Sequence, residues 1–547
     1  MKRYGIRALT HSFLRVSGSL AVLGLIALSF NAAAGDKQIF GVAKNGLMAA
    51  DALNLTLLGH QELQGRTAYQ PTIHKYNAGP AAGHTFLFVG HFSGQSVLNP
   101  LTGVVEANGT SIVDVTNPSS PVYVHHIPSN GSQMVRVCDG VTGTLGTTGK
   151  VYMLRSNGSA APNSKHETYD VTDPNNPIPL ATVVDGLSNT HKSWWECETG
   201  IAYLVAGANT SAAKPDGWTN SSTQHVKIFD LSDPANPVYI RDIGLVGQNP
   251  GSAFTSAQVP TGMVHGPISV IRNPQTGELV NRLYLPYGVS SDGVFIIADR
   301  LKVLPSGNTS AGQPIGGSWN PATSTSTNPR QAPTDADLLA FQVGRMDMTK
   351  SEGGHTSWPV YSVPLKHYQG FTSNTTRDLV LLISEETDNK CTGSPHFGYV
   401  VDATRTVGGA GHFSGEQYPM VMSTMQVFED SAKPDFCTRG TRFGTHSTEE
   451  TYFAPYYGKL TFIAYFDGGA RVFDIRDPYH PLEVAHYVPP INANTQPTVV
   501  NNQSFLDVST DNLELDQNGL VYAVDRVGGG LDILMLSGAA ALIVNSP

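Results

Sequence analysis

The sequence predicts an all-β protein, a seven-bladed β-propeller closed by an N-terminal strand. The first observation is a repeated phrase: an apolar strand, then Asp-x-x-(Asp/Asn)-Pro-x-x-Pro, then a second strand. Such a unit cannot bury its apolar face alone, so it must stack on copies of itself. The second observation is composition, with 56 Gly, 35 Pro, only 14% charged residues and no long helical periodicity. Both observations are typical of a protein built from many short strands and turns.

Seven copies of the repeat can be counted along the chain. The four clear copies carry their strand-ending aspartates at Asp114, Asp170, Asp230 and Asp474, and the weaker copies are placed by Asp299, Asp402 and Met535. The units are about 60 residues long, whereas a four-stranded blade needs about 40 to 50. We therefore expect blades with long loops.

The count also predicts how the ring closes. The seventh unit shows three strands, at 512–515, 521–525 and 531–536, and no clear fourth, while an apolar strand at 54–63 precedes the first unit. If this N-terminal strand completes the last blade, the ring closes and its open edge disappears. We expect one domain over 51–547, with loop insertions near 304–333 and 387–418.

The repeated phrase resembles the LVIVD repeat, which is named for its apolar-strand-plus-Asp core. The core reads Ser-Ile-Val-Asp at 111–114 and Val-Phe-Asp at 472–474, and the copies cover most of the chain. The family forms β-propellers in many secreted bacterial proteins. The resemblance therefore implies the fold and says little about activity.

The N-terminus has the pattern of a signal peptide. Basic residues precede an apolar run at 16–30, and Ala32-Ala33-Ala34 offers a cleavage site. We expect a signal peptide at 1–34, a linker at 35–50 and a periplasmic or secreted protein without an integral membrane span; an uncleaved anchor is the alternative. The net charge of −10 argues against a nucleic-acid partner.

The four cysteines suit an oxidising compartment. Cys138 and Cys197 occupy similar places on the inner strands expected in blades 2 and 3, within disulfide reach if those strands are neighbours. Cys391 and Cys437 flank blade 5 and would pair across an insertion. Other pairings remain open from the sequence alone.

Histidines recur where the expected inner strands begin. Inner strands line the axis of a propeller, so residues at one register on several blades converge on one point. Neutral imidazoles meeting there predict a transition-metal site, for Fe, Cu or Zn. The candidate ligands are His74, His191, His265, His355 and His446. Glu196 and Glu450 are the candidate catalytic carboxylates, because metal-bound histidines normally donate their other N–H to such a group.

A structural explanation stands beside the metal hypothesis, because histidines in these loops can simply bond the backbone of the next blade. Three further residues are candidate substrate contacts. His91 should share the face of the inner-strand starts, and Trp194 and Trp358 could wall a pocket. The alternatives are structural: His91 could belong to an ordinary turn, and the two tryptophans could pack as wedges between blades.

Two classes of function follow. The first is a metal-dependent oxidoreductase acting on a small molecule, similar in concept to carotenoid-cleaving oxygenases and to methanethiol oxidases of the selenium-binding family, both propellers with histidine-bound metal. This likeness is one of architecture, because no local motif of either family is present. A hydrolase using metal-activated water is a variant. The second is a non-catalytic propeller that binds a protein or a glycan.

Overall fold

The structure is a computed structural model of the 547-residue chain. The residues that it describes are 51–158, 163–207, 218, 224–254, 266–289, 293–304, 333–349, 351–365, 376–405, 415–427 and 435–545. All of them belong to one compact unit. The expected signal peptide and linker, and nearly all of the insertion near 304–333, lie outside the described residues.

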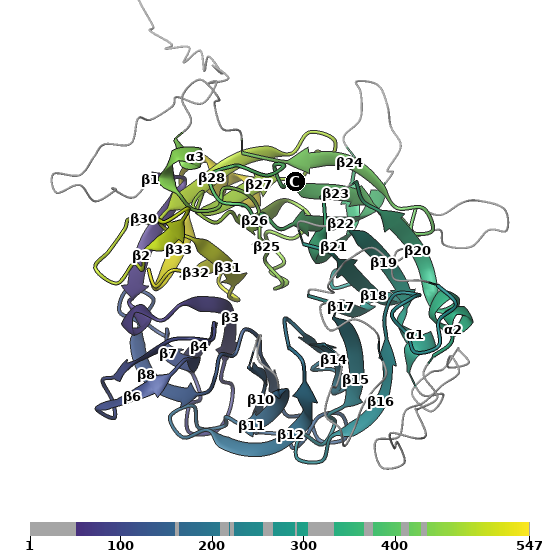
Figure 1. Cartoon of the computed structure of the whole chain (residues 1–547), viewed down its shortest axis with the longest axis horizontal. Helices are drawn as coiled ribbons and strands as arrows, with labels where there is room; N and C mark the ends of the chain where they lie inside the picture. The colour runs from purple at the N-terminus through teal and green to yellow at the C-terminus, as the bar shows by residue number, and fades with distance from the viewer. Residues whose placement is uncertain are drawn as a thin grey trace, which may run out of the picture. The chain divides into compact units, whose positions relative to one another are not determined.

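Seven antiparallel sheets surround a central axis, as the repeat count predicts (Figure 1). In each blade the first strand lies nearest the axis and the following strands pair outward. Blade 1 contains β3 (Ala68–Lys75), β4 (Thr85–His91), β7 (Gly109–Asp114) and β8 (Val122–Pro128). Blade 2 contains β9 (Val135–Asp139), β10 (Val151–Asn157), β11 (Ser164–Asp170) and β12 (Ile178–Leu187). Blade 3 contains β13 (Trp194–Trp195), β14 (Ile201–Ala206), β15 (His225–Asp230) and β16 (Val238–Ile243).

The other four blades repeat this order. Blade 4 contains β17 (Ile268–Arg272), β18 (Leu279–Tyr287), β19 (Val294–Asp299) and β20 (Gln342–Asp347). Blade 5 contains β21 (Gly354–Pro364), β22 (Thr376–Ser384), β23 (Gly398–Asp402) and β24 (Met420–Met425). Blade 6 contains β25 (Ser447–Thr448), β26 (Leu460–Ala464), β27 (Ala470–Asp474) and β28 (Leu482–Val488). Blade 7 contains β31 (Thr510–Leu515), β32 (Leu520–Asp525), β33 (Leu531–Leu536) and, as its outer strand, β2 (Leu55–Gln61).

The repeated phrase is a turn between the third and fourth strands of a blade. In blade 1, the carboxylate of Asp114 accepts the backbone N–H of Thr116 at 2.9 Å, and the Asn117 side chain accepts that of Ser119 at 3.2 Å. Blade 3 repeats the first bond between Asp230 and the backbone N–H of its turn. The aspartates therefore cap backbone amides in Asx turns, as expected of Asp and Asn in this position.

The N-terminal strand closes the ring. β2 pairs antiparallel with β33, with Leu55 opposite Leu536 and Gln61 opposite Leu531. The sequence did not reveal a second closing strand, β1 (Asp51–Leu53), which pairs with β28 as a fifth strand of blade 6. Residues 51–61 thus link blades 6 and 7.

The hydrophobic core lies between the blades. One cluster joins Leu87 and Val113 of blade 1 to Val524 and Ile533 of blade 7, and the others likewise combine side chains of neighbouring blades. Each blade therefore buries both faces against its neighbours, which fixes the register of the inner strands around the axis.

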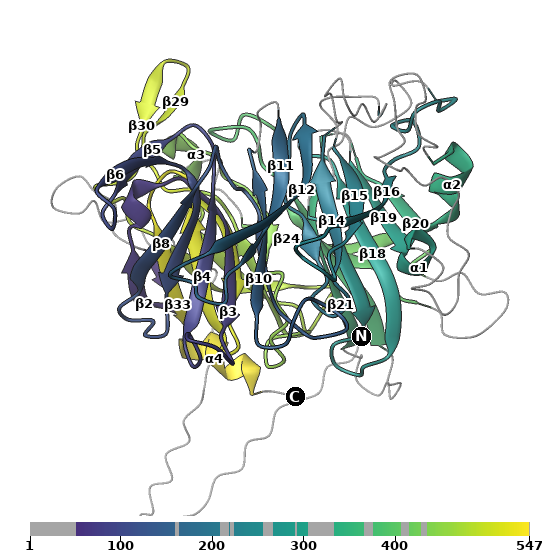
Figure 2. The same cartoon turned by 90° about the horizontal axis from the view of Figure 1, so that it is seen from below.

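The remaining elements decorate this ring. The inner strands begin on the face drawn uppermost in Figure 2, called the upper face below; it carries the hairpins β5 (Ser96–Asn99) with β6 (Val104–Ala107) and β29 (Thr498–Val500) with β30 (Gln503–Phe505). The helices are short: η1 (Leu63–Gly65), α1 (Arg300–Val303), α2 (Asp335–Ala340), α3 (Phe436–Arg439) and α4 (Gly538–Val544). Within the described part of the chain, no helix is long and apolar enough to cross a membrane.

Both disulfides form as expected. Cys138 on β9 pairs with Cys197 just after β13, and Cys391 pairs with Cys437 in α3, each with a Cα–Cα distance of 5.3 Å. The first links the inner strands of blades 2 and 3, and the second links blade 5 to blade 6. Two disulfides are compatible with an extracellular location.

Candidate metal centre on the central axis

The inner strands present one ring of side chains where they begin. The positions are Tyr69, Gln133, His191, His355, His446 and Asp511, for blades 1, 2, 3, 5, 6 and 7. His265 of blade 4 lies outside the described residues. In blades 1, 5 and 7 the pairing of the first two strands shifts register at this position, so Tyr69, His355 and Asp511 lie at β-bulges. Bulges re-aim side chains, here toward the axis.

His355 and His446 form the centre of this ring. Their rings lie 4.4 Å apart between centroids, and both residues are at most 1% exposed. His355 Nδ1 lies 2.6 Å from the backbone carbonyl oxygen of His446, and His446 Nδ1 lies 2.5 Å from that of Asp511. A carbonyl oxygen only accepts, so both imidazoles must carry their proton on Nδ1. In a neutral imidazole that carries its proton on Nδ1, Nε2 is the acceptor. Burial also lowers the pKa of His446 well below its usual value.

Glu385 completes a group of three acceptors. It follows the last residue of β22, and its carboxylate oxygens lie 3.5 Å from His355 Nε2 and 4.0 Å from His446 Nε2. One ligand atom from each residue falls within 4.8 Å of the others. Burial raises the pKa of Glu385, against the opposing effect of Arg442, which donates to Oε1 at 3.0 Å.

His191 lies beside this group and already has partners on both ring nitrogens. The Tyr69 hydroxyl lies 3.2 Å from Nε2, and the Gln133 side-chain oxygen lies 3.3 Å from Nδ1. The ring of His191 is 6.1 Å from that of His355. Burial raises the pKa of Tyr69 well above its usual value, so its phenol is protonated at neutral pH and donates to His191. Tyr69 therefore lies between His191, to which it donates, and His446, whose ring is 5.5 Å from the Tyr69 ring.

A buried ionic cluster forms around Lys192, the residue that follows His191 just before the inner strand of blade 3. Lys192 Nζ lies 2.7 Å from Glu450 Oε1, and the Arg136 guanidinium donates to the other oxygen of the same carboxylate. Burial favours the neutral form of Glu450, but Lys192 and Arg136 outweigh it and lower its pKa. Glu450 was expected to orient the metal ligands; instead it neutralises two buried cations.

Glu196 and His74 are placed elsewhere. Both oxygens of Glu196 accept from Arg300, at 2.7 and 2.6 Å, rather than from a histidine. His74 lies 3.1 Å from the carboxylate of Asp139. The expectation for His74 assigned the wrong residue of blade 1 to the ring: Tyr69 occupies that register, and His74 follows five residues later, about 16 Å along an extended strand.

The three candidate substrate contacts lie in packed surroundings. His91 is fully buried and bonds the Ser111 hydroxyl at 2.7 Å, and burial lowers its pKa well below the usual value. Trp194 stacks on the Arg136 guanidinium at 4.7 Å. Trp358 is 8% exposed and belongs to the hydrophobic core.

Sequence reasoning missed Tyr69, Gln133, Asp511 and Glu385. The first three could have been found by aligning the inner strands and reading the same register in blades without histidine. Glu385 sits at the end of a second strand and joins the site only through the packing of blade 5, so no spacing in the sequence indicates it.

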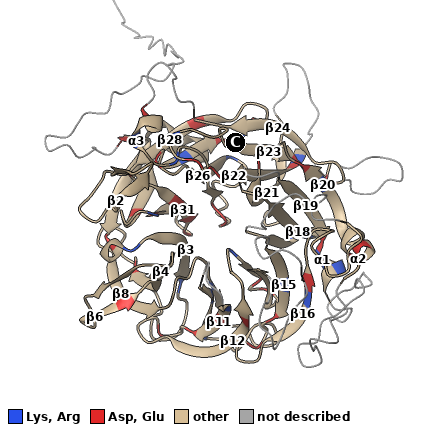
Figure 3. Cartoon of the chain, viewed as in Figure 1, with Lys and Arg blue, Asp and Glu red and all other residues tan. Residues whose placement is uncertain are grey.

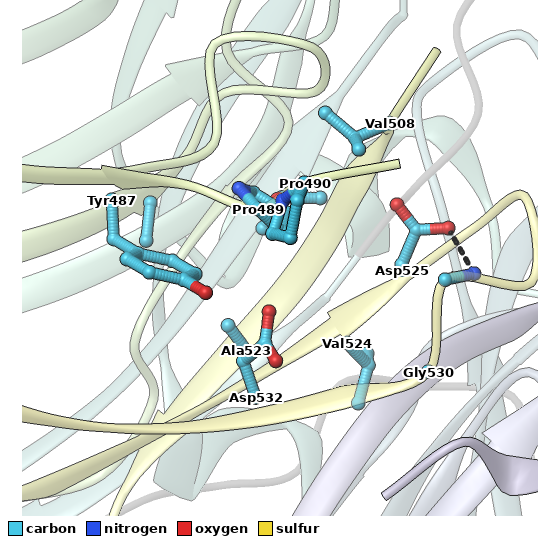
Figure 4. A pocket seen from close by; sticks show the side chains of 12 residues that line it. Tyr487, Pro489, Pro490, Val508, Ala523, Val524, Asp525, Gly530 and Asp532 are labelled. Carbon is cyan, nitrogen blue, oxygen red and sulfur yellow. Dashed lines mark hydrogen bonds between the residues drawn. The ribbon is translucent and has the colours of Figure 1, made fainter. Parts of the chain in front are cut away.

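The tight gap between blades 6 and 7 offers no alternative site. Figure 4 shows it between Tyr487, Pro490 and Asp532, and its volume is about 10 Å³, room for a single water. The charged residues drawn in Figure 3 are of both signs around the ring.

Comparison with known proteins supports the fold. The LVIVD repeat family model matches residues 104–127, so the chain carries an LVIVD repeat within a seven-bladed β-propeller. No curated protein matches the chain.

Solved structures with a similar arrangement are distant. Sqt1 of Chaetomium thermophilum is 11% identical with a TM-score of 0.44, over 88% of this chain and 99% of that chain, and it has also been solved bound to the N-terminus of the ribosomal protein L10. A candidate 6-phosphogluconolactonase of Bacteroides uniformis is 9% identical with a TM-score of 0.39, over 82% and 92%. The Dos1 propeller is 9% identical with a TM-score of 0.39, over 89% and 97%. At these values the similarities say nothing about activity.

Proposed function

We propose that the protein is a metal-dependent oxidoreductase whose centre is held by His355, His446 and Glu385. The observation that carries the proposal is the tautomer of the two histidines. Each gives its Nδ1 proton to a backbone carbonyl, so two Nε2 lone pairs and one carboxylate converge within 4.8 Å. Acceptors that face one another need a positive charge between them, either a proton or a metal ion.

The ligand set favours a redox metal. Two histidines and one carboxylate with open positions are the set typical of non-haem iron oxygenases, and imidazole also suits copper. Ligand atoms bound at about 2.0–2.1 Å around one tetrahedral ion lie about 3.4 Å apart, close to the 3.5 Å between Glu385 Oε2 and His355 Nε2. The other carboxylate oxygen, Oε1, lies 4.0 Å from His446 Nε2. Zinc fits the same ligands and would instead support the hydrolytic variant.

The structural explanation of the histidines accounts for only one of the two nitrogens in each ring. Bonding to the next blade uses Nδ1 of His355 and of His446. It gives no reason for their Nε2 atoms to approach a buried carboxylate.

The surroundings suggest what the chain contributes to catalysis. A bound metal would supply redox chemistry, while Tyr69 and His191, joined at 3.2 Å, are placed to move a proton beside it. His355, His446 and Glu385 are at most 7% exposed, so the substrate must be small. The Lys192–Glu450–Arg136 cluster supports the inner strands next to the ring.

The location of the protein belongs to the same proposal. We place the protein in the periplasm or outside the cell, where both disulfides persist.

A second candidate function is a non-catalytic binding propeller for a protein or a glycan. It is favoured by the hairpin of β5 and β6, on which Leu98, Leu101, Val104 and Val105 are 53–65% exposed. Such apolar exposure is common at protein interfaces.

The test is titration of the metal-free protein with Cu²⁺ and Fe²⁺, followed by electron paramagnetic resonance of the copper form. The proposal expects one ion per chain with nitrogen couplings from two imidazoles. A His355→Ala/His446→Ala variant should lose the signal, whereas His74→Ala should keep it. An unchanged signal in the double variant contradicts the proposal. Oxygen uptake with small reductants then tests the reaction class.

A further inference from the structure

A second cavity lies between blades 5 and 6, separate from the three proposed metal ligands. It has a volume of about 340 Å³ and is lined by Phe397, His396, Phe443, Tyr465 and the Cys391–Cys437 disulfide, among others. This volume falls in the range of small-molecule sites. A more open, polar cavity of about 420 Å³ shares Gly393 and His396 with it. The polar cavity and the cavity with aromatic walls therefore adjoin at these two residues.

The aromatic walls are held rigidly. The rings of Phe443 and Tyr465 lie 5.2 Å apart, and Phe436 stacks on Phe443 at 4.6 Å from outside the cavity lining. Phe443 and Tyr465 are at most 8% exposed. A planar ring in the chamber would meet pre-formed edges and faces, which favours aromatic molecules.

His396 supplies a fixed polar group. Its Nδ1 lies 2.6 Å from the Ser384 hydroxyl and 3.7 Å from a carboxylate oxygen of Glu352. Because the carboxylate oxygen only accepts, it favours the proton on Nδ1, which leaves Nε2 of the neutral His396 ring as an acceptor. Tyr399 donates to the same Glu352 at 2.7 Å, which keeps this chain of hydrogen bonds in place. Burial lowers the pKa of His396 to about 4, so the ring is neutral at pH 7.

We propose that this cavity binds a small uncharged aromatic molecule with one hydrogen-bond donor, of the phenol class. The ring lies among Phe397, Phe443 and Tyr465, and its hydroxyl donates to His396 Nε2. The cavity shares no residue with the three proposed metal ligands, but it adjoins them in sequence: Glu386 on its wall follows Glu385, and Phe443 lies three residues before His446.

The probes that test the proposal are phenol and toluene, which have the same number of heavy atoms. Ligand-observed NMR on the purified protein at pH 7 should give saturable binding of phenol at low millimolar concentration or below. Toluene leaves the buried His396 acceptor without a donor, so it should bind at least fivefold more weakly.

Two variants and one control make the result decisive. Val427→Trp, on the cavity wall, should abolish binding of both probes, and His396→Leu should remove the preference for phenol over toluene. The melting temperature of each variant is compared with that of the unchanged protein, and Val427→Trp keeps the test valid if His396→Leu does not fold. His355→Ala/His446→Ala should bind phenol normally, which separates this site from the metal centre. No saturable binding of phenol at 10 mM, or equal binding by folded Val427→Trp, overturns the proposal.

Discussion

Replacing Glu450 by Gln tests the account of the buried ionic cluster. Lys192 and Arg136 both contact this carboxylate, and the exposed fractions of the Lys192, Arg136 and Glu450 side chains are 1%, 9% and 2%. Removing one partner of a buried ion pair costs about 3–5 kcal/mol, because the remaining charge stays buried and uncompensated. The amide of Gln keeps the shape and removes the charge.

The expected change in melting temperature follows from the size of the domain. Unfolding entropy is about 2.1 cal/mol/K per residue, or about 1 kcal/mol/K for a domain of about 500 residues. A loss of about 3–5 kcal/mol then lowers the melting temperature by about 3–5 °C. Scanning calorimetry at one fixed scan rate measures it.

A matched control is Glu198→Gln, which removes the half-exposed carboxylate 3.5 Å from Arg272. Surface pairs contribute about 0–1 kcal/mol, so this variant should melt within about 1 °C of the unchanged protein. If Glu450→Gln also melts within 1 °C, the cluster is not the buried counter-charge described above.

Two further predictions concern the links between blades. Changing Cys138 and Cys197 to Ser removes a disulfide with a sequence separation of 59, and the chain-entropy relation gives a loss of about 4 kcal/mol, measured by denaturant unfolding; an unchanged midpoint would contradict it. The hydrogen bond to Asp532 raises the pKa of His60, so its stabilisation of the closing strand is complete below the unfolded pKa of about 6.5 and is lost as the pH rises through the folded pKa. His60→Asn should therefore destabilise the protein at pH 5.5 more than at pH 8.5, and an equal loss at both pH values would refute the link.

Much of the fold could be predicted from the sequence because the repeat is local. The Asp-x-x-(Asp/Asn)-Pro-x-x-Pro phrase specifies a turn through hydrogen bonds between residues close in sequence, such as Thr116 to Asp114. The turn can therefore be recognised from the sequence without knowledge of the fold. The closing role of β2 followed from counting strands. The short strand β1 was missed because three residues carry no periodic pattern and pair only with the distant β28.

The candidate site was less predictable because it depends on register. His191, His355 and His446 share one position, but β-bulges decide which residue of an inner strand faces the axis, and in blade 1 this is Tyr69 rather than His74. Glu196 could not be placed from the sequence because its partner, Arg300, lies 104 residues away on the next blade.

The central claim is that the Nε2 atoms of His355 and His446 hold a metal ion with Glu385. The most direct measurement is elemental analysis of the untagged purified protein, beside His355→Ala/His446→Ala and His74→Ala. The account predicts about one Fe or Cu per chain in the unchanged protein and in His74→Ala, and none in the folded double variant. Absence of metal from the unchanged protein even after reconstitution, or equal metal in the double variant, would contradict it.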